Sequence, residues 1–295
     1  IETDTPYAGA EKTQMKLGVD VLPKFNRDAT DRNRTSPFAF TGNKFEFRMP
    51  GSSQSIASPT TTINAIMADE LSRFYDELSQ AEDFNEALHE LVRRTFSEHR
   101  RIIFGGNGYE NAWVEEAERR GLANLANTAQ ALPKYILPKN IELMTRQGVY
   151  SKEEILSRHE IHMEKYCKVI RIEARTLVDM VQHEILDAVS AYEDRLCGTV
   201  LRKRQAAPEI TCHVEKSLAS TLAIRNEELL EEVVALKTAL ETEPADAAME
   251  ERVTYYHEVV EAGMEKVCET VNQLEALTAT RDWPYPTFYK LLFSV

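Results

Sequence analysis

The sequence has few cysteines, no long apolar run and no excess of positive charge. Its cysteines, Cys167, Cys197, Cys212 and Cys268, form no C-x-x-C pair, which argues against a disulfide scaffold or zinc ribbon and favours a reducing compartment such as the cytoplasm. No stretch reaches the roughly 18 consecutive apolar residues of a membrane span. With 35 Lys and Arg against 48 Asp and Glu, the formal net charge is −13. This charge disfavours a general nucleic-acid or anionic-membrane binder.

The chain does have the length and hydrophobicity of a folded protein. It contains 295 residues, of which 43% are hydrophobic, enough for one large domain or two ordinary ones. It opens on Ile1 with neither Met nor the basic and apolar segments of a signal peptide, so we expect it to be a piece of something longer.

Two histidines, His159 and His162, lie close together in the sequence. Their spacing is one residue short of the H-E-x-x-H zinc motif, and the sequence offers no third ligand near them. We interpret them as ordinary histidines on a helix surface or in hydrogen bonds, with a metal site as the alternative.

The hydrophobic period changes near residue 60. Before it, five of the 11 prolines interrupt short stretches of alternating apolar and polar residues, such as 15–22 and 44–48, and a period of two predicts strands. After it, apolar residues recur every three or four positions, which predicts amphipathic helices over 63–78 and 84–96. Glycines and prolines between 105 and 150 leave room only for short helices, such as 110–119 and 140–146.

Three long helices are predicted beyond residue 150. The first begins with the capping-box pattern Ser151-Lys152-Glu153-Glu154 and carries an apolar stripe from Ile170 to Leu196. The second has its stripe over 218–240 and the third over 253–274. Short links imply antiparallel neighbours, and we interpret the stripes as a bundle core. The aromatic, proline-rich segment 283–288 should dock either on the protein body or on a neighbouring subunit.

The stretch 44–48 carries the most chemistry. Strand geometry would point Lys44, Glu46 and Arg48 to one face and Phe45 and Phe47 to the other, where we expect the aromatic rings to be buried. A carboxylate between two cations suits a polyphosphate–metal site, because the carboxylate takes a hard cation and the cations neutralise anionic oxygens. A cross-strand ion-pair ladder on a solvent-facing sheet is the alternative, and the pattern does not decide between them.

The longer block around this stretch, Asp31-Arg32-Asn33-Arg34-Thr35-Ser36-Pro37-Phe38-Ala39-Phe40-Thr41-Gly42-Asn43-Lys44-Phe45-Glu46-Phe47-Arg48, resembles the end of the catalytic domain of glutamine synthetases, in particular the type III class. The stretches 18–23, 101–104 and 106–109 are also similar to that class. The resemblance implies an α+β fold, with the C-terminal strands of a glutamine synthetase catalytic domain followed by a mainly helical region with three long antiparallel helices.

The resemblance also implies roles for single residues. Glu46 would be a ligand of a catalytic divalent metal, Mg²⁺ or Mn²⁺, and Arg34 would contact the phosphates of ATP and take part in catalysis. Arg48 would stabilise the transferring phosphoryl group, and Lys44 stands at the nucleotide site where relatives often have arginine. Ala39 stands where many relatives have an active-site arginine.

By this resemblance, residues 1–80 would end the catalytic domain, 81–150 would form a helical connection, and 151–295 would form the long-helix bundle and docking tail. The activity implied is ATP-dependent formation of L-glutamine from L-glutamate and ammonia through γ-glutamyl phosphate. The implied partners are these substrates, the missing N-terminal portion and further copies in stacked hexameric rings, and we expect these 295 residues alone to be inactive. The alternative is a non-catalytic helical scaffold, which would have no need of the block 31–48.

Overall fold

The computed structural model describes residues 14–15, 25–26, 38–40, 44–48, 51, 54–244 and 246–293. The chain forms two compact units: Ile1–Ala126 with Pro138–Ser151, and Asn127–Leu137 with Lys152–Val295. The segment 127–137 therefore belongs to the second unit, although the chain returns to the first unit before the long helices begin.

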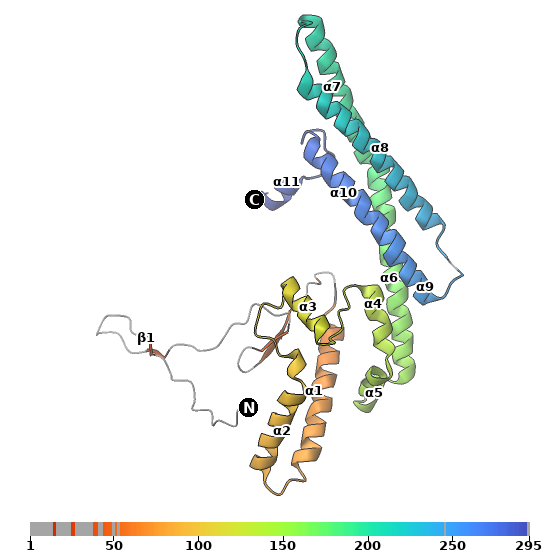
Figure 1. Ribbon diagram of the computed structural model, residues 1–295. Coiled ribbons are helices and arrows are strands. Elements are labelled where there is room, and N and C mark those ends of the chain that lie inside the picture. Colours follow the sequence, from red (N-terminus) through yellow and green to blue (C-terminus); the bar gives the residue numbers. More distant parts are fainter. Residues whose placement is uncertain are drawn as a thin grey trace. The chain divides into compact units, whose positions relative to one another are not determined.

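The first unit combines short strands with helices (Figure 1). β1 (Gln14–Met15) pairs antiparallel with β2 (Phe25–Asn26), and β3 (Phe38–Phe40) pairs antiparallel with β4 (Phe45–Phe47). The helices that follow are α1 (Ala57–Leu78), α2 (Phe84–Glu98), the 3₁₀ turn η1 (Arg100–Ile102), α3 (Asn111–Arg119) and α5 (Pro138–Arg146). Helices are thus confirmed over all four stretches predicted between residues 63 and 146.

The apolar faces of α1 and α2 are largely exposed. Among the described residues of these helices, only Ala65 and Asp69 of α1 and Leu91 of α2 are buried, whereas Leu71 is 59% exposed and Phe96 is 47% exposed. An apolar stripe predicts that one face of a helix can pack against another element, but burial of that face depends on whether such an element is present. Two neighbouring helices are too few to cover both stripes.

Hydrogen bonds to the buried carboxylate of Asp69 join α1 to α5. Arg146 donates from Nε to Asp69 Oδ1 and from Nη2 to Asp69 Oδ2, both at 2.8 Å, and Gln147 donates to the same carboxylate at 2.9 Å. The hydrogen bonds from Arg146 hold the pKa of Asp69 below its usual value despite the burial of the carboxylate. This two-point contact fixes α5 against α1 through residues 77 positions apart in the sequence.

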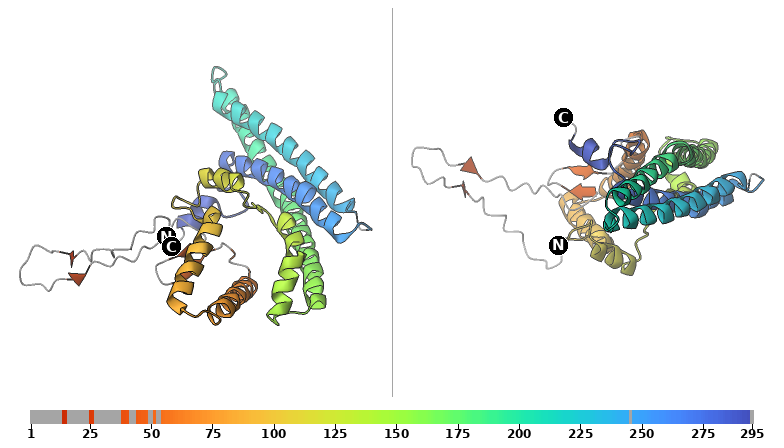
Figure 2. Two further views of the ribbon diagram at one scale, coloured as in Figure 1. Left: turned by 60° about the horizontal axis from the view of Figure 1, so that its bottom comes forward. Right: turned by 90° about the horizontal axis from the view of Figure 1, so that it is seen from above.

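The second unit is helical. Its elements are α4 (Thr128–Ala131), the 3₁₀ turn η2 (Leu132–Ile136), α6 (Lys152–Met180), η3 (Val181–Ile185), α7 (Leu186–Ala206), α8 (His213–Glu241), α9 (Met249–Tyr255), η4 (Tyr256–Glu261), α10 (Ala262–Leu277) and α11 (Phe288–Phe293). The π-helical turns η3 and η4 join α6 to α7 and α9 to α10 without a break. The predicted long helices are therefore confirmed. Helix α8 lies beside α7 and beside α10 (Figures 1 and 2).

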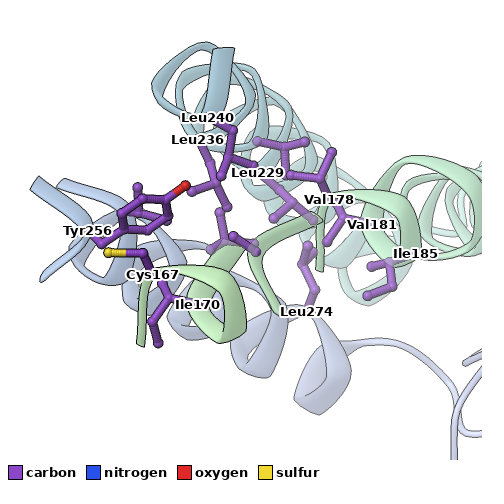
Figure 3. Packing of buried hydrophobic residues seen from close by; sticks show 14 of the residues in the cluster. Cys167, Ile170, Val178, Val181, Ile185, Leu229, Leu236, Leu240, Tyr256 and Leu274 are labelled. Atoms are coloured by element: carbon purple, nitrogen blue, oxygen red, sulfur yellow. The ribbon is translucent and has the colours of Figure 1, made fainter. Parts of the chain in front are cut away.

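The core of the second unit is built along one face of α8 (Figure 3). Leu222, Leu229, Val233, Leu236 and Leu240 of α8 are all buried, and they recur every three, four or seven residues. The buried residues that share this cluster from the other helices and from the segment after α10 are Met163, Cys167, Ile170, Ala174, Val178, Val181, Ile185, Val189, Val253, Tyr256, Val260, Val267, Leu274 and Trp283. The predicted stripes therefore form a bundle core.

Both π turns lie within this core. Val181 and Ile185 are buried in η3, and Tyr256 and Val260 are buried in η4. A four-residue spacing of apolar residues suits an α-helix and a π turn alike, so the sequence pattern did not distinguish them.

The C-terminal segment packs on the bundle of its own chain. Trp283 is part of the core cluster, and Tyr285 packs against it. Arg195 of α7 holds Asp282 at two points, with Nη1 2.6 Å from Oδ1 and Nη2 2.5 Å from Oδ2. The segment 283–288 was expected to dock either on the protein body or on a neighbouring subunit. In the structure, Trp283 and Tyr285 pack on helices of the same chain. Within the described ranges, we find no helix of the length and apolar character that a membrane crossing requires.

Replacing Leu229 by Ala should lower the free energy of unfolding by about 2–5 kcal/mol, because a fully buried leucine side chain is removed and a cavity remains. The matched control is the neighbouring Leu230→Ala, since Leu230 is 47% exposed and its loss should change stability by no more than about 0.5 kcal/mol. Urea unfolding followed by circular dichroism measures both, and equal effects of the two substitutions would contradict the assigned core face.

Candidate functional site

The hairpin β3–β4 carries the residues singled out by the sequence. Phe38 pairs with Phe47, Ala39 with Glu46, and Phe40 with Phe45. Glu46 therefore faces Ala39 across the hairpin, and Ala39 is 1% exposed. Because directly opposed residues have Cβ atoms about 5 Å apart, a longer side chain at position 39 would lie beside the Glu46 carboxylate.

Glu46 is held between the two cations predicted to share its face. Arg48 Nη2 donates to Glu46 Oε2 at 2.6 Å, and Lys44 Nζ lies 3.5 Å from Glu46 Oε1. The hydrogen bond from Arg48, with smaller contributions from the charges of both cations, holds the pKa of Glu46 below its usual value. Glu46 is therefore ionised at neutral pH, which is the state that a hard cation requires in a carboxylate ligand.

These ion pairs run along β4 and not across the hairpin. Both cations paired with Glu46 lie two positions away along the chain, on either side of β4, and the cross-strand neighbour of Glu46 is an alanine. The two ion pairs of Glu46 are therefore not the cross-strand pairs that the ladder interpretation requires.

The aromatic face of the hairpin differs from expectation. Phe45 and Phe47 alternate with the charged residues as predicted, but they are 57% and 46% exposed, so the prediction that they are buried is wrong for this chain. Both rings lie beside Phe38, whose ring centroid is 5.2 Å from that of Phe45 and 6.1 Å from that of Phe47. A two-stranded hairpin has no second layer of its own to cover one face.

The remaining candidate residues are Arg34, His159 and His162. Arg34 lies outside the described residues. His159 is buried in α6, and the ring of His162 lies edge-on to Tyr135 with centroids 5.6 Å apart. Among the residues that the structure describes, no three His, Cys, Asp or Glu side chains gather as a metal cage would require. The described residues can thus supply one carboxylate ligand, Glu46, to a metal whose other ligands come from elsewhere.

Comparison with known proteins shows which proteins this chain is similar to. Residues 87–204 match the model of the glutamine synthetase C-terminal domain. The chain is 35% identical over 301 residues to a glutamine synthetase of Butyrivibrio fibrisolvens, covering 100% of this chain and 42% of the relative. It is also 35% identical over 300 residues to the type-3 glutamine synthetase of Dictyostelium discoideum, covering 99% of this chain and 40% of the relative.

The chain is homologous to the C-terminal part of glutamine synthetases. A third relative, a glutamine synthetase of Bacteroides fragilis (strain YCH46), is 31% identical over 303 residues, which is 99% of this chain and 41% of the relative. The resemblance to type III glutamine synthetases is thereby confirmed. The chain spans about two fifths of the length of the curated relatives it matches.

The region matched to the glutamine synthetase C-terminal domain also contains a charged site that the sequence reasoning missed. Two arginine doublets, Arg100-Arg101 and Arg119-Arg120, lie 18 positions apart in the sequence and line one hollow in the structure. The available signal was the occurrence of three arginine doublets, Arg93-Arg94 and these two, within 28 residues of a chain of net charge −13.

The pKa of Glu46 should lie below its usual value and should rise toward that value in Arg48→Gln, because the substitution removes the strongest hydrogen bond to the carboxylate. Lys44→Gln is the matched control, since Lys44 is farther from the carboxylate and should change the pKa less. Carboxyl ¹³C shifts of glutamate-labelled protein, assigned through Glu46→Gln, measure the titration. An unchanged pKa in Arg48→Gln would refute this electrostatic account.

Proposed function

We propose that this chain supplies the last active-site strand of a glutamine synthetase, an enzyme that forms L-glutamine from L-glutamate and ammonia with ATP. The observation that carries the proposal is an ionised carboxylate, Glu46, held between Lys44 and Arg48 on β4. This strand lies in the block 31–48 that resembles the catalytic domain, in a chain homologous to glutamine synthetases.

The proposed roles follow from charge and geometry. Arg48 presents a planar guanidinium that can bind a phosphoryl group at two points, whereas Lys44 presents a compact charge on a flexible stem. In the reaction, the side-chain carboxylate of L-glutamate attacks the γ-phosphate of ATP and gives γ-glutamyl phosphate, and ammonia then displaces phosphate. Arg48, with Arg34 upstream, would stabilise the negative charge on the transferring phosphoryl group.

Glu46 would hold Mg²⁺ or Mn²⁺ through its carboxylate oxygens. Such an ion neutralises charge on the phosphates of ATP when it is bound. Because Glu46 is paired with Arg48 at 2.6 Å in this structure, ion binding would free the Arg48 guanidinium for a phosphate or a substrate carboxylate. The same residue pair can thereby serve the metal and the anionic substrate.

We also propose a separate role for each of three parts of the chain. Residues 1–80 would end the catalytic domain, 81–150 would connect it to the helical region, and 151–295 would support assembly into stacked hexameric rings. The bundle favours an assembly role because its core is complete within the second unit while residues such as Ile172 and Leu201, at 65% and 70% exposure, remain on its surface.

In a full-length glutamine synthetase containing these residues, Glu46→Gln should lower turnover on the order of 100-fold or more, because an ionised oxygen ligand becomes a neutral amide. The matched control is Glu228→Gln, since Glu228 is also paired to an arginine, Arg225, at 2.5 Å but lies on α8. The control should keep its activity. Wild-type turnover in Glu46→Gln would overturn the proposed metal role.

The 295-residue chain by itself should form no glutamine. The chain's candidate site residues are one carboxylate, Glu46, and three cations, Arg34, Lys44 and Arg48. These are too few to hold ATP together with its metal ions. The assay is ammonia-dependent, ATP-dependent formation of glutamine, with a full-length enzyme as the positive control. Glutamine formation by the purified chain would show that the residues described here suffice for catalysis, contrary to the proposal.

A further inference from the structure

Four arginines surround a hollow of about 550 Å³ in the first unit. Arg100 and Arg101 come from η1, and Arg119 and Arg120 come from the C-terminal end of α3, with Ile103 completing the lining. We propose that this arginine hollow binds a small molecule carrying two or more phosphate charges, such as a pyrophosphate group. The inference concerns a site other than β4 and does not depend on the proposed role of Glu46.

The hollow has a fixed wall. Arg120 donates from Nε to Glu116 at 2.5 Å and from Nη1 to the carbonyl oxygens of Arg101 and Ile103 at 3.2 and 2.9 Å. Its guanidinium also lies 5.6 Å from the ring centroid of Trp113. These contacts join the end of α3 to the segment 101–103, so the backbone that carries the arginines is positioned before any ligand arrives.

The positive charge in the hollow exceeds the negative charge beside it. Arg119 and Arg120 share the single carboxylate of Glu116, and the hydrogen bonds from these two arginines lower the pKa of Glu116 to about 2. The guanidinium of Arg101 has no hydrogen bond or ion pair to any residue that the structure describes. An anion with several charges can therefore meet the guanidinium of Arg101, and Arg119 and Arg120 together carry more positive charge than the Glu116 carboxylate neutralises.

The dimensions favour a small ligand. A second hollow, also of about 550 Å³, shares Arg100 and Ile103 with the first and adds Arg93 and Arg94. Volumes of this size are typical of small-molecule sites. Arg93 and Arg94 are paired with Glu90 and Glu77, so the second hollow is less positive than the first. The charge is thus concentrated over one turn and one helix end, which suits a compact phosphate better than an extended nucleic-acid strand.

The test uses the 295-residue chain and pyrophosphate as the probe in isothermal titration calorimetry at low salt. We expect one saturable site, weakened about tenfold or more by Arg101→Ala and by Arg119→Ala, because each substitution removes charged hydrogen bonds to the anion. Arg225→Ala is the matched control, since Arg225 also pairs with a glutamate three positions away on its helix. Its binding should equal that of the unmodified chain.

Arg120 is left unchanged because it holds the wall of the hollow, and circular dichroism checks that each variant folds. Failure to detect saturable binding of pyrophosphate would overturn the proposal. Equal weakening by Arg225→Ala would also overturn it, because the interaction would then reflect general charge. Tighter binding of a single-stranded oligonucleotide of matched charge, weakened by the same substitutions, would assign the arginines to nucleic acid instead.

Discussion

The second unit depends on the burial of one face of α8. Leu222, Leu229, Val233 and Leu236 are each no more than 1% exposed, and every long helix of the unit contributes to the cluster that covers them. Burial of a leucine or valine side chain stabilises the fold by about 1.5–3 kcal/mol. These buried residues therefore contribute more to the stability of the unit than the exposed ion pairs on the surface of the same helices. The bundle can therefore fold around its own core.

The first unit differs from the second in how far its apolar side chains are buried. Its polar contacts are strong where they are buried, as between Asp69 and Arg146, but its apolar faces are incompletely covered. Phe45 and Phe47 project from a two-stranded hairpin, and Leu71 and Phe96 are exposed on α1 and α2. The proposed function explains this contrast, because a strand that completes an active site needs the neighbouring sheet, whereas a bundle needs only its own helices.

Sequence reasoning was most successful where one physical effect decides the structure. The stripe that ends at Leu240 predicted both a helix and its buried face, because only one face of an amphipathic helix can contact the core. Alternation predicted opposite faces for Glu46 and Phe45 but not the exposure of Phe45, which depends on residues outside the hairpin. The burial of Asp69 could not be predicted either, since its partner Arg146 is 77 positions away.

The function proposed for this chain depends on Glu46 acting as a metal ligand in the active site of a glutamine synthetase. The most direct test is anomalous diffraction from crystals of a full-length enzyme containing this chain, grown with Mn²⁺ and an ATP analogue. The account predicts an anomalous peak about 2.1 Å from a carboxylate oxygen of Glu46, as expected for a small hard cation. An active-site Mn²⁺ with full ligation and no contact to Glu46, while Glu46 remains paired with Arg48, would contradict it.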